Sequence, residues 1–508
     1  MGKSIENETI FNTAPQTENN SYKQMAKSSG IVAFVQIFQM LFGLVRNKAI
    51  ALIVGTSGFG IWSLYHTFLE MTGNFSVFGL DRGGVREIAK KAEKTEELGK
   101  CIFSFRFIIF VFATICSIIV FVGSKEISLF VFNDVSYSLG IKTISIVVIL
   151  QGVFKAEYSI LNGLHAIKYI AYSQIIGAVA GSVGAILFVY FGREEYIVFG
   201  LSVVIISGVL TTSYYVHKLK VKTIWPQFRE FLPISKRLLY LGLGFTVSGL
   251  VSTVMTLLSR SYLSSHYSLD AVGIYQASWT ISNLYIGIIL NAMGIDFLPR
   301  LSKVSEDNDK CNQMLNEQLD FAIPLASIGV TIILVFSSAI LALLYSSDFT
   351  SGGNIIRWQV VGVFMRVLAF PFSYAIMAKA KPIQYALTQI VFWTSDYLLL
   401  ILFSSLFGFN GLGINYVVAY VGFLSMVYLF SRYNSRFSFS KRTLITIITN
   451  VSVIISIWIL RCFVDGMFLY MIGLIAVILQ IFYVNQHIKA RMQIDLIGCI
   501  KNKMFHNK

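Results

Sequence analysis

Residues 30–54 read GIVAFVQIFQMLFGLVRNKAIALIV, an apolar run long enough to cross a lipid bilayer as a helix. Polar or small residues recur along it at steps of three or four, which places them on one helix face: Gln36, Gln39, Gly43 and Arg46. A guanidinium within the hydrocarbon region costs roughly 2.5 to 3.5 kcal/mol on insertion scales, so such side chains usually face a bundle interior or a watery cavity. The stripe therefore predicts a membrane protein with a polar interior, as in a transporter.

The composition of the whole chain extends this prediction to many crossings. Its 508 residues are 55% hydrophobic and 13% charged, and the mean hydropathy is +0.69. A soluble domain could not bury that much apolar surface. Apolar runs of at least ~17 residues predict an all-α polytopic membrane protein with about fourteen transmembrane helices. The predicted segments are 30–54, 58–80, 101–123, 139–163, 170–191, 196–216, 240–262, 271–297, 319–345, 354–379, 383–407, 411–431, 443–464 and 467–485.

The positions of the basic residues predict the orientation. With a cytoplasmic amino terminus and fourteen crossings, most of the 41 Lys and Arg residues fall in tails and loops on the cytoplasmic side. This imbalance follows the positive-inside rule, so both termini are predicted to be cytoplasmic. The net charge of +15 is spread over loops instead of forming one basic face, which favours membrane lipids over nucleic acid as a partner.

Motifs of common enzymes and ATPases are missing from the sequence. It has no G-x-x-x-x-G-K-[ST] phosphate loop, no H-E-x-x-H pair and no paired Cys-x-x-C. The segment Asp307-Asn308-Asp309 has the D-x-D form of a metal site, but the short loop around it favours plain solvated side chains. We expect no enzymatic activity, no metal site and no cofactor, with coupling to H⁺ or Na⁺ left open.

Short motifs recur in the same order in both halves of the chain. Arg46 is followed fourteen residues later by Gly60 in SGFGIW (57–62), and Arg260 thirteen residues later by Gly273 in DAVGIY (270–275). An even number of helices between two copies gives both copies the same orientation in the membrane. The repeat predicts two six-helix bundles around a central cleft, with two extra C-terminal helices outside it.

These predictions divide the chain into six regions. Residues 1–25 are rich in Asn, Glu, Ser and Thr without an apolar core, so they resemble a flexible tail and not a cleaved signal peptide. The regions are a flexible cytoplasmic tail (1–27), an N-terminal six-helix bundle (28–216), a basic cytoplasmic linker (217–239), a C-terminal six-helix bundle (240–431), two additional helices (432–486) and a basic cytoplasmic tail (487–508).

Three stretches carry a family resemblance: GLVRNK (43–48), GTSGFGIW (55–62) and GLDRGGVRE (79–87). They resemble the polysaccharide flippases of the multidrug, oligosaccharidyl-lipid and polysaccharide exporter superfamily, especially the O-antigen translocases. The resemblance implies that an undecaprenyl-diphosphate-linked oligosaccharide is moved from the inner to the outer leaflet of a bacterial cytoplasmic (inner) membrane. Its use would be in O-antigen, lipopolysaccharide or capsule biosynthesis, with a polysaccharide polymerase and chain-length machinery as further partners.

Three intramembrane arginines are candidate ligands of the substrate diphosphate: Arg46, Arg260 and Arg366. A planar guanidinium can hold phosphate oxygens in a bidentate manner. Arg46 lies on the polar stripe, whereas Lys48 lies about 200° further around the helix. Arg366 lies near mid-depth of its segment. Snorkelling to the outer interface is the alternative for Arg46 and Arg260.

Three further side chains are candidates for ion coupling or for pairing within the cleft: Glu70, Asp396 and Asn415. Glu70 follows His66 by four residues near the middle of its segment, where it could pair with Arg46, bind H⁺ or Na⁺, or crosslink helices. Asp396 has no Lys or Arg within one helical turn. An Arg366–Asp396 pair and an ion site that includes Asn415 are therefore both open.

The sequence thus favours an alternating-access flippase for a lipid-linked oligosaccharide. A cation-coupled multidrug exporter of the same superfamily is the alternative. Cationic drugs would require an acidic and aromatic cleft, and the intramembrane arginines favour an anionic cargo instead. A membrane scaffold without transport activity would leave the intramembrane charges dispensable.

Overall fold

The structure is a computed structural model that describes residues 14–464 and 466–492. Within these residues the chain forms fifteen α-helices and four short 3-10 turns, and no strand. The predicted all-α fold is confirmed. The α-helices are α1 (Ala14–Val77), α2 (Leu80–Lys91), α3 (Thr95–Val122), α4 (Ser124–Phe132), α5 (Ser138–Gly163), α6 (Ile167–Gly192), α7 (Ile197–Lys218), α8 (Phe228–His266), α9 (Leu269–Lys303), α10 (Asn308–Leu344), α11 (Gly353–Ala378), α12 (Pro382–Phe407), α13 (Gly411–Ser435), α14 (Lys441–Phe463) and α15 (Met467–Met492).

Helix α1 holds two of the predicted segments as two arms that meet at Gly55. This residue has φ 67° and ψ −164°, a backbone conformation that glycine adopts far more readily than residues with a side chain. The helix begins at Ala14, so residues 14–27 of the expected tail have a helical backbone, and residues 1–13 lie outside the described part. Counting the arms of α1 separately and leaving out the short α2 and α4 gives fourteen long helices, in agreement with the sequence prediction.

The apolar stretches of the described residues account for most of these helices. By length and composition nine of them could cross a membrane, or ten if α9 is counted as one bent span. Three of the nine each hold two long segments: Ala33–Val77 the two arms of α1, Ile167–Lys218 the helices α6 and α7, and Pro382–Ser435 the helices α12 and α13. In contrast, α2 has twelve residues and is about 18 Å long, well short of a hydrocarbon core of about 30 Å.

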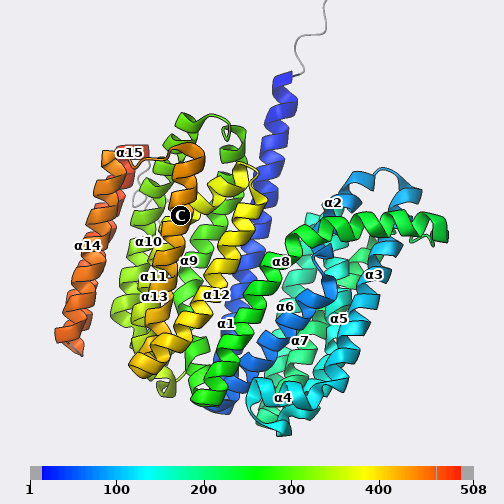
Figure 1. The fold of residues 1–508 in the computed structure, drawn as a ribbon, viewed down its shortest axis with the longest axis horizontal. Coiled ribbons are helices and arrows are strands. Elements are labelled where there is room, and N and C mark those ends of the chain that lie inside the picture. Colours follow the sequence, from blue (N-terminus) through cyan, green and yellow to red (C-terminus); the bar gives the residue numbers. More distant parts are fainter. Residues whose placement is uncertain (1–13, 465, 493–508) are drawn as a thin grey trace, which may run out of the picture.

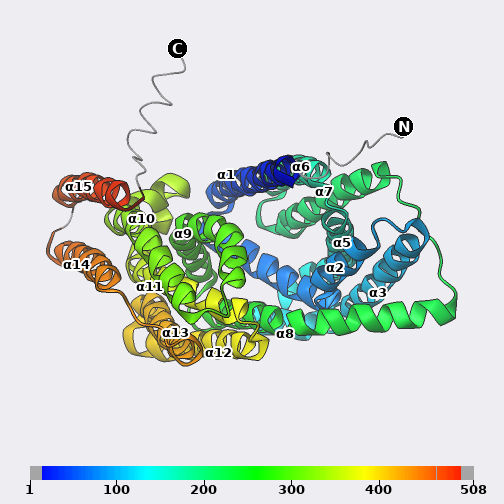
Figure 2. The ribbon, with the colours of Figure 1, turned by 90° about the horizontal axis from the view of Figure 1, so that it is seen from above.

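The long helices form two groups that lie side by side (Figure 1). One group, here called the N-terminal bundle, contains α1 to α7, and the other, the C-terminal bundle, contains α8 to α13. The first arm of α1 lies between the two groups, as the view from above also shows (Figure 2), and it packs against α6 on one side and α9 on the other. The first arm of α1 can therefore border a cavity between the bundles.

Helix α8 connects the bundles. It begins at Phe228, inside the segment expected to be a linker, and runs across one end of the N-terminal bundle before it turns to pack beside α12 (Figure 1). Hydropathy alone does not reveal its first turns because they carry Arg229, Glu230, Lys236 and Arg237. Salt bridges from Lys100 to Glu230 (2.8 Å) and from Arg237 to Glu87 (3.0 Å) attach this part of α8 to α3 and α2.

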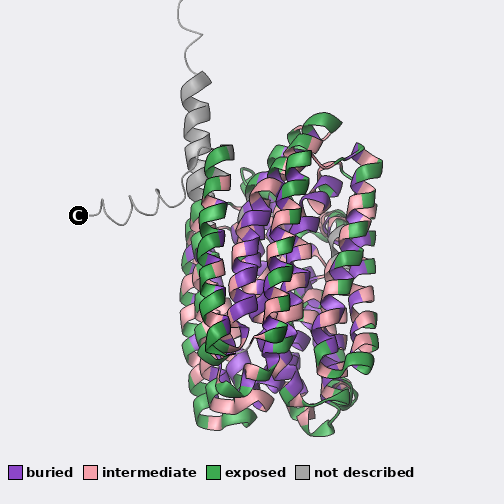
Figure 3. Ribbon diagram, turned by 90° about the vertical axis from the view of Figure 1, so that its left-hand side faces the viewer, coloured by how far each residue is buried: buried purple, intermediate pink, exposed green. Residues whose placement is uncertain are grey.

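Apolar side chains cover the outside of the molecule as well as its core. Buried residues follow the inner helices, and exposed residues lie on the outward surfaces (Figure 3). Many of the exposed residues are large and apolar, such as Ile119, Leu210 and Leu429. An exterior of this kind requires lipid in place of water as the surrounding solvent.

Helices α14 and α15 pack on the outside of the C-terminal bundle against α10. A buried hydrogen-bonded triad joins the three helices. Ser327 Oγ of α10 donates to Asn450 Oδ1 of α14 at 2.6 Å, and Gln480 Nε2 of α15 donates to Ser327 Oγ at 2.8 Å. Polar groups in an apolar medium find partners between helices, so this triad fixes the position of both C-terminal helices.

Candidate functional site

The polar faces of α1 and α9 line one cavity between the two bundles. Its volume is about 430 Å³. Gln36 and Gln39 border it from α1. The polar or small residues that border it from α9 are Thr280, Asn283, Gly287 and Asn291. Apolar side chains such as Met40 and Leu284 complete the wall, so the cavity can accommodate a ligand with both polar and apolar parts.

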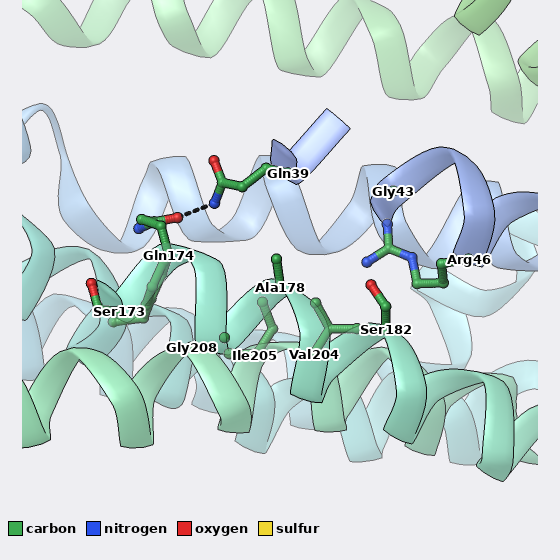
Figure 4. Close-up of a pocket in the computed structure, with 12 residues that line it drawn as sticks. Gln39, Gly43, Arg46, Ser173, Gln174, Ala178, Ser182, Val204, Ile205 and Gly208 are labelled. Carbon is green, nitrogen blue, oxygen red and sulfur yellow. Dashed lines mark hydrogen bonds between the residues drawn. The ribbon is translucent and has the colours of Figure 1, made fainter. Parts of the chain in front are cut away.

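Arg46 lines a second space, a groove of about 190 Å³ between α1, α6 and α7 (Figure 4). Its guanidinium carbon lies 5.4 Å from the centre of the Trp62 ring on the second arm of α1. Its buried Nε has no hydrogen-bond partner among the described residues. Arg46 therefore faces the interior of the N-terminal bundle, with hydrogen-bonding capacity left for a ligand. Gln39 borders both this groove and the α1–α9 cavity.

Arg260 of α8 is engaged by protein groups in this conformation. The residue is 5% exposed, and its Nε donates to Ser63 Oγ of α1 at 3.2 Å and to Gln276 Oε1 of α9 at 3.0 Å. The side chain thus links one helix of the N-terminal bundle to two of the C-terminal bundle. A ligand could reach this guanidinium only after those contacts are rearranged.

Glu70 lies on the second arm of α1 with its side chain 58% exposed, 4.0 Å from His66 Nδ1. No ion pair joins it to Arg46 in the part of the chain that the structure describes. Both Arg46 and Arg260 are close enough to act on His66 electrostatically, and one turn beyond Glu70 the side chain of Asn74 accepts a hydrogen bond from Lys155 Nζ at 2.6 Å. The second arm of α1 therefore presents a polar face to the interior.

Arg366 of α11 lies behind the α1–α9 cavity and does not line it. Its Nη1 donates to Asn283 Oδ1 at 2.9 Å, and Tyr416 Oη donates to the same oxygen at 3.0 Å. Asn283 itself borders the cavity. Two donors on one oxygen fix the orientation of the Asn283 amide, so Arg366 acts on the cavity through this residue.

Asp396 of α12 is 7% exposed and accepts a hydrogen bond from Asn415 Nδ2 of α13 at 2.9 Å. Asn415 Oδ1 is buried without a hydrogen-bond partner in the described residues. No ion pair between Arg366 and Asp396 occurs among those residues, and they contain no group of three His, Cys, Asp or Glu that could hold a metal ion. The pair presents buried oxygens, the donor type that hard cations and protons prefer.

The two bundles touch at the end of the molecule where α4 lies in Figure 1. A Cβ on Gly60 of α1 would lie 2.0 Å from the Leu269 carbonyl oxygen, and one on Gly273 of α9 would lie 2.1 Å from the Thr56 carbonyl oxygen. These are the glycines of the two copies of the internal repeat. Thr56 also donates a hydrogen bond to Asp270. The absence of side chains at both glycines lets the backbones cross in contact and closes this end.

The partners that α6 and α9 supply to the arginines were not predicted from the sequence. Gln174 and Ser182 border the Arg46 groove from α6, and Gln276 of α9 holds Arg260. The sequence of α6 does indicate a polar face, because Ser173, Gln174 and Gly177 lie at helical spacing in an otherwise apolar segment.

Comparison with known proteins places this geometry in a family. The profile of a family described as polysaccharide biosynthesis protein matches residues 25–305. The lipid III flippase of Escherichia coli K12 is 23% identical over 393 residues, which cover 75% of this chain and 90% of the relative. A Shigella flexneri protein described as a candidate O-antigen transporter is 27% identical over 340 residues, 65% of this chain and 78% of the relative.

Solved structures show the same fold. The lipid II flippase MurJ in an inward closed conformation superposes with a TM-score of 0.72 at 16% identity, covering 91% of this chain and 99% of the other. An inward-facing multidrug resistance MATE family transporter superposes with a TM-score of 0.68 at 15% identity, covering 78% and 94%. The chain therefore belongs to the polysaccharide biosynthesis protein family and has the fold of the superfamily that contains the lipid-linked glycan flippases and the MATE exporters.

Proposed function

We propose that this protein is a flippase for undecaprenyl-diphosphate-linked oligosaccharide repeat units and moves them from the inner to the outer leaflet of the cytoplasmic membrane. The observation that carries the proposal is the arrangement around α1, where an inward-facing arginine with an unpartnered Nε adjoins a cavity lined by amides. Guanidinium suits a diphosphate, and amides suit sugar hydroxyls. The similarity to a lipid III flippase and to a candidate O-antigen transporter supports this substrate class.

Alternating access is the mechanism that we infer for the movement. The Gly60–Gly273 crossing closes one end of the molecule, and the α1–α9 cavity lies between the bundles. Separation of the bundles at the crossing would break the hydrogen bond from Arg260 to Ser63 and open the guanidinium to the space between the bundles. Arg46 would then hold the diphosphate in one state, and Arg260 would become available in the other.

Ion coupling is assigned to one carboxylate in each bundle. Asp396 with Asn415 forms the candidate site in the C-terminal bundle, and Glu70 beside His66 forms the candidate in the N-terminal bundle. Protons and Na⁺ both bind to such groups, so we propose either one as the coupling ion. A polysaccharide polymerase and chain-length machinery are the expected partners that use the translocated product. We propose that both termini are cytoplasmic, because the basic loops follow the positive-inside rule in that orientation.

The membrane potential favours export of this cargo. Moving one negative charge outward across an inside-negative membrane releases roughly 2.3 kcal/mol per 100 mV. A doubly charged diphosphate would gain about twice that amount if no cation accompanied it. Ion coupling would then serve to reset the empty transporter, which must return without cargo.

The experiment is lipid extraction from a strain that lacks this gene. Accumulation of an undecaprenyl-diphosphate oligosaccharide, with loss of surface polysaccharide, is expected. The wild-type gene should reverse the accumulation, and Arg46→Ala should not. A second candidate, multidrug export, rests on the fold shared with the MATE transporter. Unchanged lipids together with altered sensitivity to cationic drugs would favour that candidate.

A further inference from the structure

The groove that contains Arg46 has two chemically distinct ends (Figure 4). One end carries the guanidinium of Arg46 beside Ser182, and the other carries the amides of Gln39 and Gln174. Between them the wall is formed by small and apolar residues of α5, α6 and α7. These are Phe154, Gly177, Ala178, Val204, Ile205 and Gly208. A cationic end, an apolar wall and an amide end in one groove suit a ligand that is itself anionic at one end and hydroxylated at the other.

The amides of Gln39 and Gln174 are hydrogen-bonded to each other. Gln39 Nε2 donates to Gln174 Oε1, and neither side chain forms another hydrogen bond in the part of the chain that the structure describes. A glutamine amide offers two donors and an acceptor with two lone pairs. Most of this capacity is therefore free, and an arriving hydroxyl or acetamido group can be bound without leaving a buried group unsatisfied.

The spacing of the two ends fits a sugar diphosphate. Gln39 and Arg46 are seven residues apart on one helix, which is two turns or about 10.5 Å along the axis. A diphosphate bonded to the anomeric carbon of a sugar places its charge and the far hydroxyls of the ring at a comparable separation. The groove volume of about 190 Å³ is suited to one sugar ring. The ring of Phe154 and the side chain of Val204 can contact the apolar face of the sugar.

We propose that this groove is the binding subsite for the first sugar of the repeat unit, the one bonded directly to the diphosphate, and that Gln39 and Gln174 determine which sugar is accepted. This proposal rests on the proposed flippase function. The remaining sugars extend into the larger α1–α9 cavity, which Gln39 also borders. Specificity for the first sugar thus resides in the N-terminal bundle, and the rest of the oligosaccharide is held less selectively between the bundles.

The test measures binding of defined lipids to the purified full-length protein in nanodiscs. The probes are undecaprenyl phosphate, undecaprenyl diphosphate, and undecaprenyl diphosphate bearing N-acetylglucosamine, N-acetylgalactosamine, glucose or galactose. The measured quantity is the sugar increment, which is the ratio of the affinity for each glycosylated lipid to that for undecaprenyl diphosphate. The variants are Gln39→Met and Gln174→Met, which keep side-chain length and remove hydrogen bonding. Gln174→Leu, which also removes the amide, replaces Gln174→Met if the methionine variant does not fold.

The control variant is Gln480→Met, which removes another interhelical amide bond, to Ser327, on the outside of the C-terminal bundle. The wild type should bind one of the glycosylated lipids about tenfold more tightly than undecaprenyl diphosphate, as expected for one or two net hydrogen bonds. Both groove variants should reduce this increment to about one while keeping their affinity for undecaprenyl diphosphate. The control should keep the increment.

Three results separate failure of this proposal from failure of the function on which it rests. If the wild type binds undecaprenyl diphosphate well but shows no sugar increment with any of the four sugars, the subsite is excluded and the flippase proposal stands. If the increment persists in both glutamine variants, the sugar is recognised elsewhere. If undecaprenyl diphosphate binds no better than undecaprenyl phosphate, recognition of the diphosphate itself is wrong.

Discussion

At the scale of single residues, Arg46 should account for recognition of the diphosphate. A hydrogen bond to a charged group contributes about 1.5 to 3 kcal/mol, so Arg46→Ala should weaken binding of undecaprenyl diphosphate by at least about tenfold. Arg46→Lys keeps the charge but loses the planar fork, and an intermediate loss is expected. Lys48→Ala is the control, because Lys48 Nζ donates to the Leu343 carbonyl of α10 at 2.6 Å, away from the groove. Equal losses in the Arg46 and Lys48 variants would argue against a specific role.

The Asp396–Asn415 pair gives a second prediction at this scale. Asp396→Asn removes the only carboxylate of the pair and nearly preserves its shape, so the fold and the binding of undecaprenyl diphosphate should be retained. Transport in proteoliposomes should then no longer respond to an imposed Na⁺ or proton gradient. The measurement is the rate of lipid translocation with and without each gradient. A variant that still responds as the wild type does would remove this pair from ion coupling.

At the scale of the helices, the crossing of α1 and α9 depends on two glycines. In Gly60→Ala the new Cβ would lie 2.0 Å from the backbone oxygen of Leu269, so the helices must move apart. A loss of about 1 to 3 kcal/mol in stability is expected for such overpacking, together with faster labelling of a cysteine placed at Ser57. Gly422→Ala is the matched control, because a Cβ there meets no atom within 4 Å. A similar fall of Tm in both variants would contradict the role of the crossing.

The attachment of α14 and α15 gives the second prediction for helices. Asn450→Leu would remove the hydrogen bond that Ser327 Oγ of α10 donates to α14, at a cost of about 0.5 to 1.5 kcal/mol. Thermal unfolding of the purified protein should show this loss. Thr449→Val, one residue away on the exposed side of α14, removes only a bond to its own helix and should leave Tm nearly unchanged. Lipid binding should be the same in both, since the triad lies outside the cavities.

At the scale of the whole molecule, the sequence predicts what depends on local pattern and fails where distant helices meet. Hydropathy reveals fourteen long segments, and the steps of three and four reveal the stripe that ends at Arg46. These local patterns cannot reveal that Gln39 pairs with Gln174. Nor can they reveal that Arg366 bonds to Asn283 instead of Asp396. Both pairings depend on how helices far apart in the sequence pack together. The early start of α8 was missed because a helix that lies across the end of a bundle need not be apolar on all sides.

The glycine crossing also bears on the origin of the molecule. Gly60 lies against Leu269 and Gly273, and Gly273 lies against Thr56 and Gly60. The two copies of the repeat therefore contact each other through equivalent positions. Reciprocal contacts of this kind characterise the interface of a two-fold symmetric dimer. A six-helix chain that paired with a second copy through this motif would already contain the crossing, and fusion of the two genes would require no new interface at that point. Later divergence could then place arginine and glutamine differently in each half while the shared contact stayed fixed.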